Sequence, residues 1–378
     1  MLSAMLFRQF CSFIFLLISF FAIATDDGVL KIQGQVFDAE TNEPLPFAHV
    51  AIGETRTITN VDGEFSISVP EVAKMEISVS FIGYKTFKSP IEADEKQFNI
   101  TLSPAATELA AVTVTTGESI IEKVFNKLRL NYELDQQHMV CYYKESLMDT
   151  KKMYYLAEGI LDVYQPSEIS SEPIEISPIR TRKKEFKQLD EEAVLIHGHA
   201  SDMLKTIVRR EKSFVNIENL KHYIYHYEGV SEYDGKEIFI LSFEPKTKKA
   251  TSKGNLFVDA ESYAIVKAEY FPLLGGNKFW DQVSWIEEFS RNGVMWNVNR
   301  VSYSGKWTID NVQYSYSSTL VVNESRVVRV PPALGLLLGD KDVFYNSAKN
   351  FSEDFWEGYT YVKLNADEKR ALESRVGG

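Results

Sequence analysis

The feature that most constrains the fold of this chain is the regular spacing of turn signals between residues 29 and 102. Segments of alternating apolar and polar residues are separated, about every ten residues, by clusters of Gly, Pro, Asn or Asp, which is typical of a small β-sandwich. In TITNVDGEFSISV, at 57–69, Asp62 and Gly63 favour a tight turn with positive φ and predict a hairpin. A calcium site at Asp62 is the alternative interpretation, but one carboxylate falls short of the six or more oxygens that Ca²⁺ takes.

The order of these strands and turns resembles the carboxypeptidase-regulatory-like domain, a transthyretin-like sandwich of seven strands. The matching positions are Gly34, Val36, Asp38, Pro44, Leu45, Ala48, Val50, Thr59, Asp62, Gly63, Phe65, Gly83 and Tyr84. The family name refers to an accessory domain of carboxypeptidases, so the resemblance implies a fold and not a peptidase. We assign residues 25–104 to this domain.

In Bacteroidota this module precedes the plug of many TonB-dependent outer-membrane transporters and begins many other exported proteins. Here a small-residue linker, predicted over 105–118, is followed by 119–378, which is too short for a plug and a barrel of about 22 strands. The resemblance therefore does not imply a transporter. It implies an envelope protein whose partner is an outer-membrane transporter or another envelope protein.

The first 24 residues predict a secretory signal peptide. Arg8 precedes the apolar run FCSFIFLLISFFAIA, which ends in a small-x-small cleavage signal after Ala24. An uncleaved anchor is the alternative. We expect an exported protein, in the periplasm or associated with the outer membrane. Cleavage removes Cys11 and leaves Cys141 alone, so no internal disulfide is expected.

The net charge of the chain is −12, which argues against nucleic-acid partners and against anionic lipid surfaces. A local basic run, RTRKKEFK at 180–187, departs from this balance. We interpret this run as a solvated loop and not as a docking site.

Residues 119–378 predict a second, larger domain that is also rich in strands. The strand-like segments include VCYYKESLM, KMYYLAEGILDVY, HYIYHYEGVSEYDGKEIFILSFEP, KGNLFVDAESYAIVKAEYF, VSWIEEFSRNGVMWNVNRVSYSGKWTID and VQYSYSSTLVV. Asp-Gly at 234–235 and Asn-Gly at 292–293 mark hairpin turns. We predict a mainly β chain whose second domain is α+β, with one curved antiparallel sheet or half-barrel. GNLFVDAESYAIVKAEY resembles the repeated hairpins of lipoprotein-carrier-like envelope proteins.

Helical periodicity appears at three places in this second domain. Residues 118–132 predict an amphipathic helix, 199–210 a second helix, and the tail a short helix that begins at Asn365 or Ala366. The polar, proline-bearing segment 165–192 predicts a long excursion or a mobile insert.

No set of residues forms a convincing catalytic, cofactor or metal site. His197, His199 and Asp202 are the alternative for a metal, but a glycine between the two histidines makes such a site loose. Cys141 lies in an apolar strand, which favours a buried, inert thiol. The neighbouring carboxylates at 287 and 288 point to opposite faces of a strand and cannot flank one glycosidic bond.

Aromatic residues are the remaining candidates for ligand binding. The candidate ligand-binding residues are Trp280, Trp285, Trp296, Trp307 and Tyr303; Trp356, Tyr314 and Tyr316 are nearby in sequence. Rings on a curved sheet can stack on sugars, peptides or acyl chains, and packing in the core is the alternative for most of them. The apolar loop at 330–340 is a candidate plug, lid or partner-binding patch.

Three hypotheses for function follow. The first is a non-catalytic envelope protein that binds or scaffolds, associated with nutrient uptake at the outer membrane or with envelope assembly. The second is a divergent envelope hydrolase with its site in 119–378. The third is a half-barrel that carries a lipid or a lipoprotein.

Overall fold

A computed structural model describes residues 29–70, 74–92, 96–105, 116–150, 152–186, 198–210, 213–339, 342–349, 356 and 358–373. The predicted signal peptide and residues 106–115 of the predicted linker lie outside this described part. No helix among the described residues combines the length and the apolarity needed to cross a membrane.

The N-terminal unit is a sandwich of two sheets. Its strands are β1 (Val29–Asp38), β2 (His49–Ile52), β3 (Thr55–Ile58), β4 (Glu64–Pro70), β5 (Glu76–Ser80), β6 (Phe87–Pro90) and β7 (Gln97–Leu102). One sheet has the order β4-β1-β7 and the other β3-β2-β5-β6. Their inner faces share one hydrophobic core, in which Ile32, Phe65 and Val79 are fully buried. This confirms the predicted seven-stranded sandwich.

The predicted hairpin at 57–69 is wrong. β3 pairs with β2 and β4 pairs with β1, so the chain crosses from one sheet to the other between them. Asn60 shapes this crossing, because its side-chain oxygen accepts hydrogen bonds from the backbone of Asp62 and Glu64. Only Gly63 has a positive φ, of 74°, whereas a type I′ hairpin turn needs it at both central residues.

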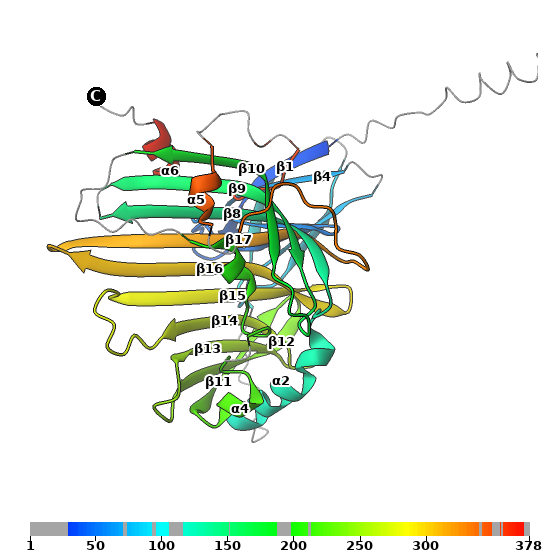
Figure 1. Cartoon of the computed structure of the whole chain (residues 1–378). Coiled ribbons are helices and arrows are strands. Elements are labelled where there is room, and N and C mark those ends of the chain that lie inside the picture. The colour runs from blue at the N-terminus through cyan, green and yellow to red at the C-terminus, as the bar shows by residue number, and fades with distance from the viewer. Residues whose placement is uncertain are drawn as a thin grey trace, which may run out of the picture.

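The C-terminal unit is one antiparallel sheet of ten strands. Its strands are β8 (Gln137–Asp149), β9 (Met153–Gln165), β10 (Glu175–Glu185), β11 (Tyr223–Tyr233), β12 (Lys236–Pro245), β13 (Ser252–Asp259), β14 (Ile265–Pro272), β15 (Gln282–Asn292), β16 (Met295–Ile309) and β17 (Val312–Val327). Their order is β10-β9-β8-β17-β16-β15-β14-β13-β12-β11, and the sheet curves without closing (Figure 1). This confirms the predicted curved antiparallel sheet.

The predicted excursion over 165–192 is wrong in its middle part. Residues 175–185 form β10, which pairs antiparallel with β9 at the edge of the sheet. The basic run at 180–187 is therefore mostly strand and not a solvated loop. Arg182 is buried, and its guanidinium lies 2.6 Å from a carboxylate oxygen of Glu158. The partner that makes this burial tolerable comes from β9, so the local sequence did not reveal it.

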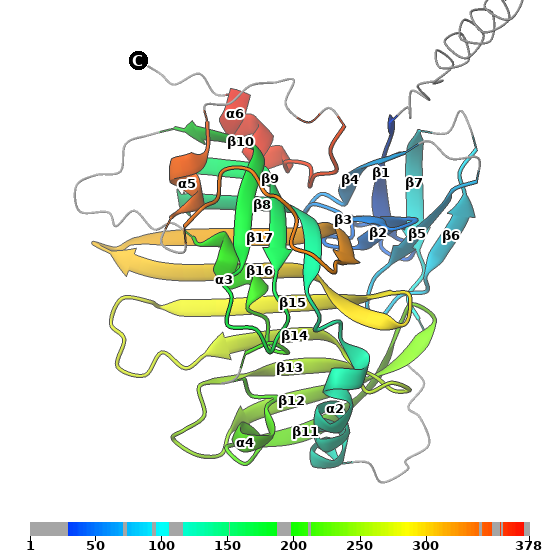
Figure 2. The same cartoon turned by 45° about the vertical axis from the view of Figure 1, so that its right-hand side comes forward.

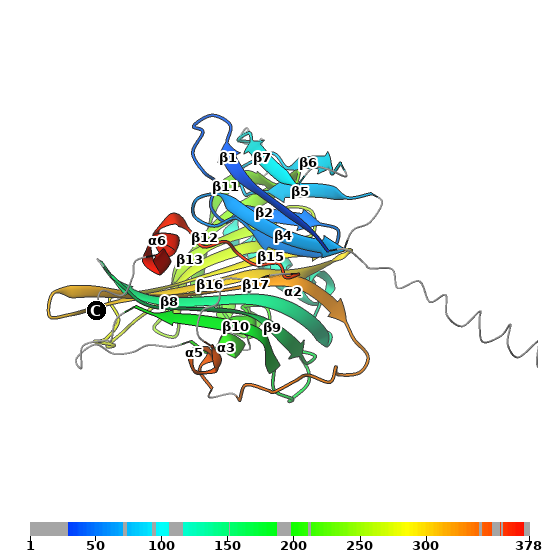
Figure 3. The same cartoon turned by 90° about the horizontal axis from the view of Figure 1, so that it is seen from above.

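The two faces of the large sheet are covered by different segments. Helices α2 (Gly117–Asn131), α3 (Ala200–Leu204), α4 (Ile217–Leu220) and α5 (Phe344–Ser347) lie on one face, which we call the helix face (Figure 2). The sandwich and α6 (Ala366–Glu373) lie on the opposite face, which we call the sandwich face (Figure 3).

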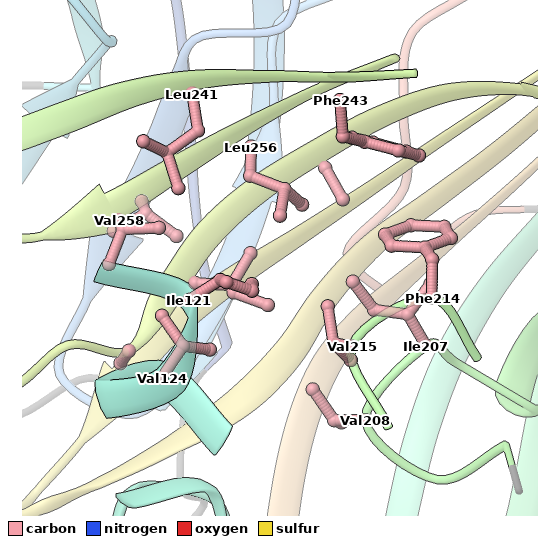
Figure 4. Packing of buried hydrophobic residues seen from close by; sticks show 14 of the residues in the cluster. Ile121, Val124, Ile207, Val208, Phe214, Val215, Leu241, Phe243, Leu256 and Val258 are labelled. Carbon is pink, nitrogen blue, oxygen red and sulfur yellow. The ribbon is translucent and has the colours of Figure 1, made fainter. Parts of the chain in front are cut away.

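Helix α2 confirms the helix predicted over 118–132. Thr116 caps it by accepting the backbone N–H of Ser119, as expected for a threonine at this position. Ile121 and Val124 point from the helix toward the strands, where they join the same buried cluster as Val258 (Figure 4). The apolar stripe of the helix thus covers the end of the sheet formed by β11 to β14.

The helix predicted over 199–210 is wrong beyond Leu204. α3 ends there, and the chain continues as a non-helical segment across the helix face. The buried carboxylate of Glu287 holds this segment, because it accepts the backbone N–H of Ile207 at 2.7 Å and pairs with Arg210 at 2.5 Å. This tertiary contact outweighs the local helical preference.

A polar contact joins the sandwich to the large sheet. His49 of β2 contacts two residues of the sheet. Its Nε2 atom lies 2.8 Å from a carboxylate oxygen of Glu288, and its Nδ1 atom lies 2.7 Å from the hydroxyl of Tyr233. Arg300 donates two hydrogen bonds to the same Glu288 carboxylate, at 2.7 and 2.8 Å. Burial opposes ionisation, yet Arg300 and His49 hold the pKa of Glu288 well below its usual value.

The tail runs along the sandwich face and ends in α6, as predicted. Asn365 and Glu368 form a capping box, in which each side chain accepts the backbone N–H of the other, at 2.8 and 2.9 Å. Thr360 also exchanges hydrogen bonds with the backbone of Ser68 in β4. The tail therefore ties the sandwich to the large sheet.

Candidate functional site

Four partly exposed aromatic side chains lie together on the helix face, and we call them the aromatic patch. They are Phe279, Trp280, Trp285 and Tyr303. Trp285 of β15 and Tyr303 of β16 are direct cross-strand partners, with ring centroids 4.9 Å apart in an edge-to-face contact. Trp280 makes a second edge-to-face contact with Tyr303, at 6.3 Å. The patch therefore forms one continuous ring surface in the middle of the sheet.

Buried rings support the patch from below. Trp307 and Tyr314 are cross-strand partners with stacked rings 5.7 Å apart, and Trp307 also contacts Trp280 at 5.4 Å. Gly305 allows this arrangement, because a Cβ at that position would overlap the ring of Trp280. The support fixes the orientation of the exposed rings, so the patch is preformed.

The structure brings together four of the five predicted ligand-binding residues. Trp280, Trp285 and Tyr303 form the patch, and Trp307 lies beneath it at 1% exposure. Trp296 is buried near the other end of β16, away from this group. The neighbouring Trp356 belongs to the small core on the sandwich face. The structure thus separates the tryptophans that the sequence presents as one cluster.

The patch lies where the two cores of the helix face meet. Trp285 and Val298 pack against both cores, one beneath α2 and one beneath α3 and α5. Arg210 lies beside this junction, with its guanidinium 5.8 Å from the ring centroid of Trp285. Its charge is balanced by Glu287, whose pKa is raised by burial although Arg210 acts in the opposite direction.

A buried carboxyl group, Glu145, lies in the core beneath α5 and was missed by the sequence analysis. Its Oε2 accepts hydrogen bonds from the hydroxyls of Tyr143 and Tyr316 and from the backbone N–H of Gly198. Burial raises the pKa of this group. A signal was present, since Glu145 alternates with Cys141 and Tyr143 on the core face of β8.

The residues proposed for a metal site do not gather in the described part of the chain. The ring of His199 lies 3.3 Å from the backbone carbonyl of Asp342, and Asp202 pairs with Lys205. No group of three or more His, Cys, Asp or Glu side chains there is arranged to hold a metal ion. His197 lies outside the described residues.

The other two chemical candidates are also accounted for. Cys141 is fully buried, and burial raises the pKa of its thiol far above the usual value. Glu287 and Glu288 point to opposite faces, as predicted, and each is already paired with an arginine. The Asp62 carboxylate accepts the backbone N–H of Ala366, which agrees with a structural role for this turn.

Comparison with known families identifies the N-terminal unit. Residues 32–114 match the model of the CarboxypepD_reg-like domain. This agrees with the resemblance found in the sequence and covers the sandwich, but not the large sheet. No curated protein matches the sequence.

Several solved structures are similar to parts of this chain at low scores. A domain described as an outer membrane lipoprotein-sorting protein, from Vibrio parahaemolyticus, has 12% identity and a TM-score of 0.28, covering 57% of this chain and 95% of that one. A LolA superfamily protein from Nitrosomonas europaea has 13% identity and a TM-score of 0.24, covering 58% and 96%. A membrane-associated protein of unknown function from Bacteroides fragilis has 14% identity and a TM-score of 0.17, covering 79% and 98%. At these scores the similarity carries no argument about function.

Proposed function

We propose that this chain is a non-catalytic binding protein of the cell envelope, and that the aromatic patch holds the acyl chain of a lipid or lipoprotein. The observation that carries the proposal is the partial exposure of four preformed rings that lie together on the helix face. An exported protein gains nothing in folding from leaving these rings in water, so their exposure favours a ligand.

The chemistry of the patch favours an apolar ligand. Its four side chains offer ring surface and only three hydrogen-bonding groups, namely two indole N–H groups and the hydroxyl of Tyr303. Burial raises the pKa of that hydroxyl to about 12, so it stays neutral at physiological pH. Covering about six methylenes of an acyl chain would supply roughly 5 kcal/mol before the costs of association, at about 0.8 kcal/mol each. Micromolar binding therefore requires a chain longer than six carbons.

The sandwich supplies the scaffold of this proposal. It is tied to the large sheet through His49 and Arg56, and to the tail through Asn60, which donates to the backbone carbonyl of Leu364. We propose that the two joined units meet an envelope partner, such as an outer-membrane transporter, and that the protein acts in the periplasm or at the outer membrane. The signal peptide predicted over 1–24 supports the proposed location.

A hydrolase has less support from the described residues. The two carboxyl groups with raised pKa values, Glu145 and Glu287, are both buried. Glu145 accepts from two tyrosine hydroxyls and a backbone N–H, and Glu287 accepts from one tyrosine hydroxyl, Arg210 and a backbone N–H. Cys141 has no access to a substrate. No observation on the helix face therefore favours catalysis over binding.

Titration of purified residues 25–378 tests the proposal. Saturated fatty acids of increasing chain length, each below its critical micelle concentration, are titrated while tryptophan fluorescence and heat are recorded. We expect affinity to rise with chain length, and Trp280→Ala and Trp285→Ala to weaken binding at least tenfold. Tyr227→Ala is the matched control, because this ring is 38% exposed but lies on β11, outside the patch.

Two outcomes would refute the assignment. Absence of saturable binding at every chain length would refute the proposal that the patch binds an acyl chain. Equal weakening by Tyr227→Ala and Trp285→Ala would show that binding is not located at the patch. A parallel titration with oligosaccharides and peptides shows whether the patch takes another ligand class.

A further inference from the structure

A cavity of about 260 Å³ lies between the sandwich and the large sheet, and we call it the interdomain pocket. The sandwich contributes Arg56 and Thr57, and the sheet contributes Asp259, Trp296 and Asn299. This volume holds several water molecules, which is the scale of a small ligand such as one sugar ring. Since the aromatic patch lies on the opposite face, this pocket is independent of the function proposed above.

Three residues of the lining carry buried polar atoms without partners among the described residues. Asn299 is 1% exposed, yet neither its amide nitrogen nor its amide oxygen has a hydrogen bond. The hydroxyl of Thr57, at 0% exposure, and the indole nitrogen of Trp296, at 3%, are also unpaired. Buried polar groups are nearly always hydrogen-bonded, because leaving them unpaired is unfavourable. Four such atoms on three residues around one cavity point to a polar ligand.

The backbone places Asn299 in an unusual position. Glu288 pairs with Arg300 and Phe289 pairs with Val298, so Asn299 is the extra residue of a β-bulge and has no partner on β15. Bulges redirect a side chain and are enriched beside functional sites. The bulge here adds one polar residue to the wall of the pocket.

The charges around the pocket cancel. Arg56 donates to the backbone carbonyl of Arg291, and none of its contacts in the described part of the chain is an ion pair with a carboxylate. Arg291 lies over the ring of Trp296, at 5.5 Å. These two cations face two anions in the lining, Asp234 and Asp259.

The remaining charged side chains of the lining are already paired. Lys236 forms an ion pair with Glu261, and His49 is held by Glu288 and Tyr233. A lining without excess charge gives no preference for an anion or a cation.

We infer that the interdomain pocket binds a small neutral polyhydroxyl ligand with the size of one sugar ring. The Asn299 amide requires an adjacent acceptor and donor, and vicinal hydroxyl groups provide both. Arg56, Thr57 and Trp296 add donors, and the Asp259 carboxylate adds an acceptor. An anion would satisfy the donors but would leave the Asn299 oxygen unpaired and would face Asp259.

The ligand would contact both units at once. Arg56 and Thr57 belong to β3, whereas Trp296 and Asn299 belong to β16. Binding therefore depends on the docked arrangement of the sandwich and stabilises it by mass action.

Trp296 supplies a local reporter for the test. The chain has five tryptophans, so protein labelled with ¹⁵N-tryptophan gives five indole N–H signals by NMR, and Trp296→Phe identifies one of them. D-glucose, D-galactose, D-mannose and N-acetyl-D-glucosamine are each titrated into residues 25–378. Sodium phosphate, sodium acetate and glycine are titrated in the same way as charged probes.

We expect a saturable shift of the Trp296 signal with at least one of the four sugars and none with the charged probes. Asn299→Ala should raise the apparent Kd at least tenfold. If Asn299→Ala does not fold, Thr57→Val replaces it, because valine has nearly the shape of threonine and lacks the hydroxyl group. Asn255→Ala on β13 is the matched control, because this residue does not line the pocket and its removal should leave the Kd unchanged.

Three results would overturn the inference. One is the absence of a Trp296 shift with all four sugars, which would mean that the pocket holds water only. Another is a saturable shift with phosphate, acetate or glycine alone, which would make it a site for charged ligands. The third is an equal loss of affinity in Asn255→Ala and Asn299→Ala.

Discussion

Replacing Glu288 by glutamine should destabilise the protein strongly, because it removes the only acid that pairs with Arg300 in the described structure. Arg300 is 2% exposed and donates two hydrogen bonds to this carboxylate, while His49 contacts it from the sandwich. Glutamine has nearly the same shape, so the variant changes charge and leaves packing almost intact. The guanidinium would then be buried without a counter-charge.

Breaking a buried ion pair by removing one partner costs about 3–5 kcal/mol, and we expect Glu288→Gln to lie in this range at pH 7. The effect should depend on pH in a defined direction. The folded-state pKa of Glu288 is held well below its usual value by Arg300 and His49 against the effect of burial. The ionised form therefore contributes its full stability above the unfolded pKa of about 4.3, and this contribution is lost as pH falls toward the folded pKa.

Urea unfolding followed by circular dichroism measures the free energy of unfolding at pH 7, 5 and 3.5. Glu244→Gln is the control, because Glu244 forms an exposed pair with His226 at 3.3 Å and should contribute at most about 1 kcal/mol. The double variant Glu288→Gln/Arg300→Met should recover part of the loss, since it also removes the buried charge. A loss below about 1 kcal/mol for Glu288→Gln, or a double variant worse than the sum of both single changes, would contradict this reasoning.

Three further predictions concern the core around Glu145. Because burial raises the pKa of Glu145, wild-type stability should fall relative to Glu145→Gln as pH rises above about 4.3, and parallel stability curves from pH 4 to 8 would contradict this. Gly198→Ala should lower the free energy of unfolding by about 1–3 kcal/mol, measured by urea unfolding, because its Cβ would overlap the hydroxyls of Tyr143 and Tyr316. Cys141 should not react with a thiol reagent in native protein and should react fully in denaturant, which absorbance measures directly; rapid native reaction would show that the strand opens.

The sequence predicted the structure correctly wherever a local pattern of residues determines the fold of a segment. Alternating residues and turn signals predicted the sandwich and the curved sheet, because a period of two determines which side chains of a strand face the core. The apolar stripe of α2 and the capping box at Asn365 were equally local, and both helices were predicted close to their observed bounds. The sandwich family was likewise apparent from the order and spacing of its turns.

The predictions from sequence were wrong where a residue far away in the chain determines the structure of a segment. The turn at Asp62 and Gly63 did not reveal that β4 would join β1 in the other sheet. Arg182 in β10 is buried with Glu158 of β9 as its ion-pair partner. Residues 205–210 leave the helix where Glu287 accepts the backbone N–H of Ile207.

By itself, the sequence determined that this chain forms two β-rich units and that its aromatic residues are concentrated in the second. Only the tertiary structure decided which rings share a surface and which polar groups are buried together. Trp285 and Tyr303 meet because β15 and β16 pair in one register, and Thr57 approaches Asn299 because the sandwich docks on the sheet. The physical reason is that strand alternation is encoded by neighbouring residues, whereas register and docking depend on contacts between residues far apart in the chain.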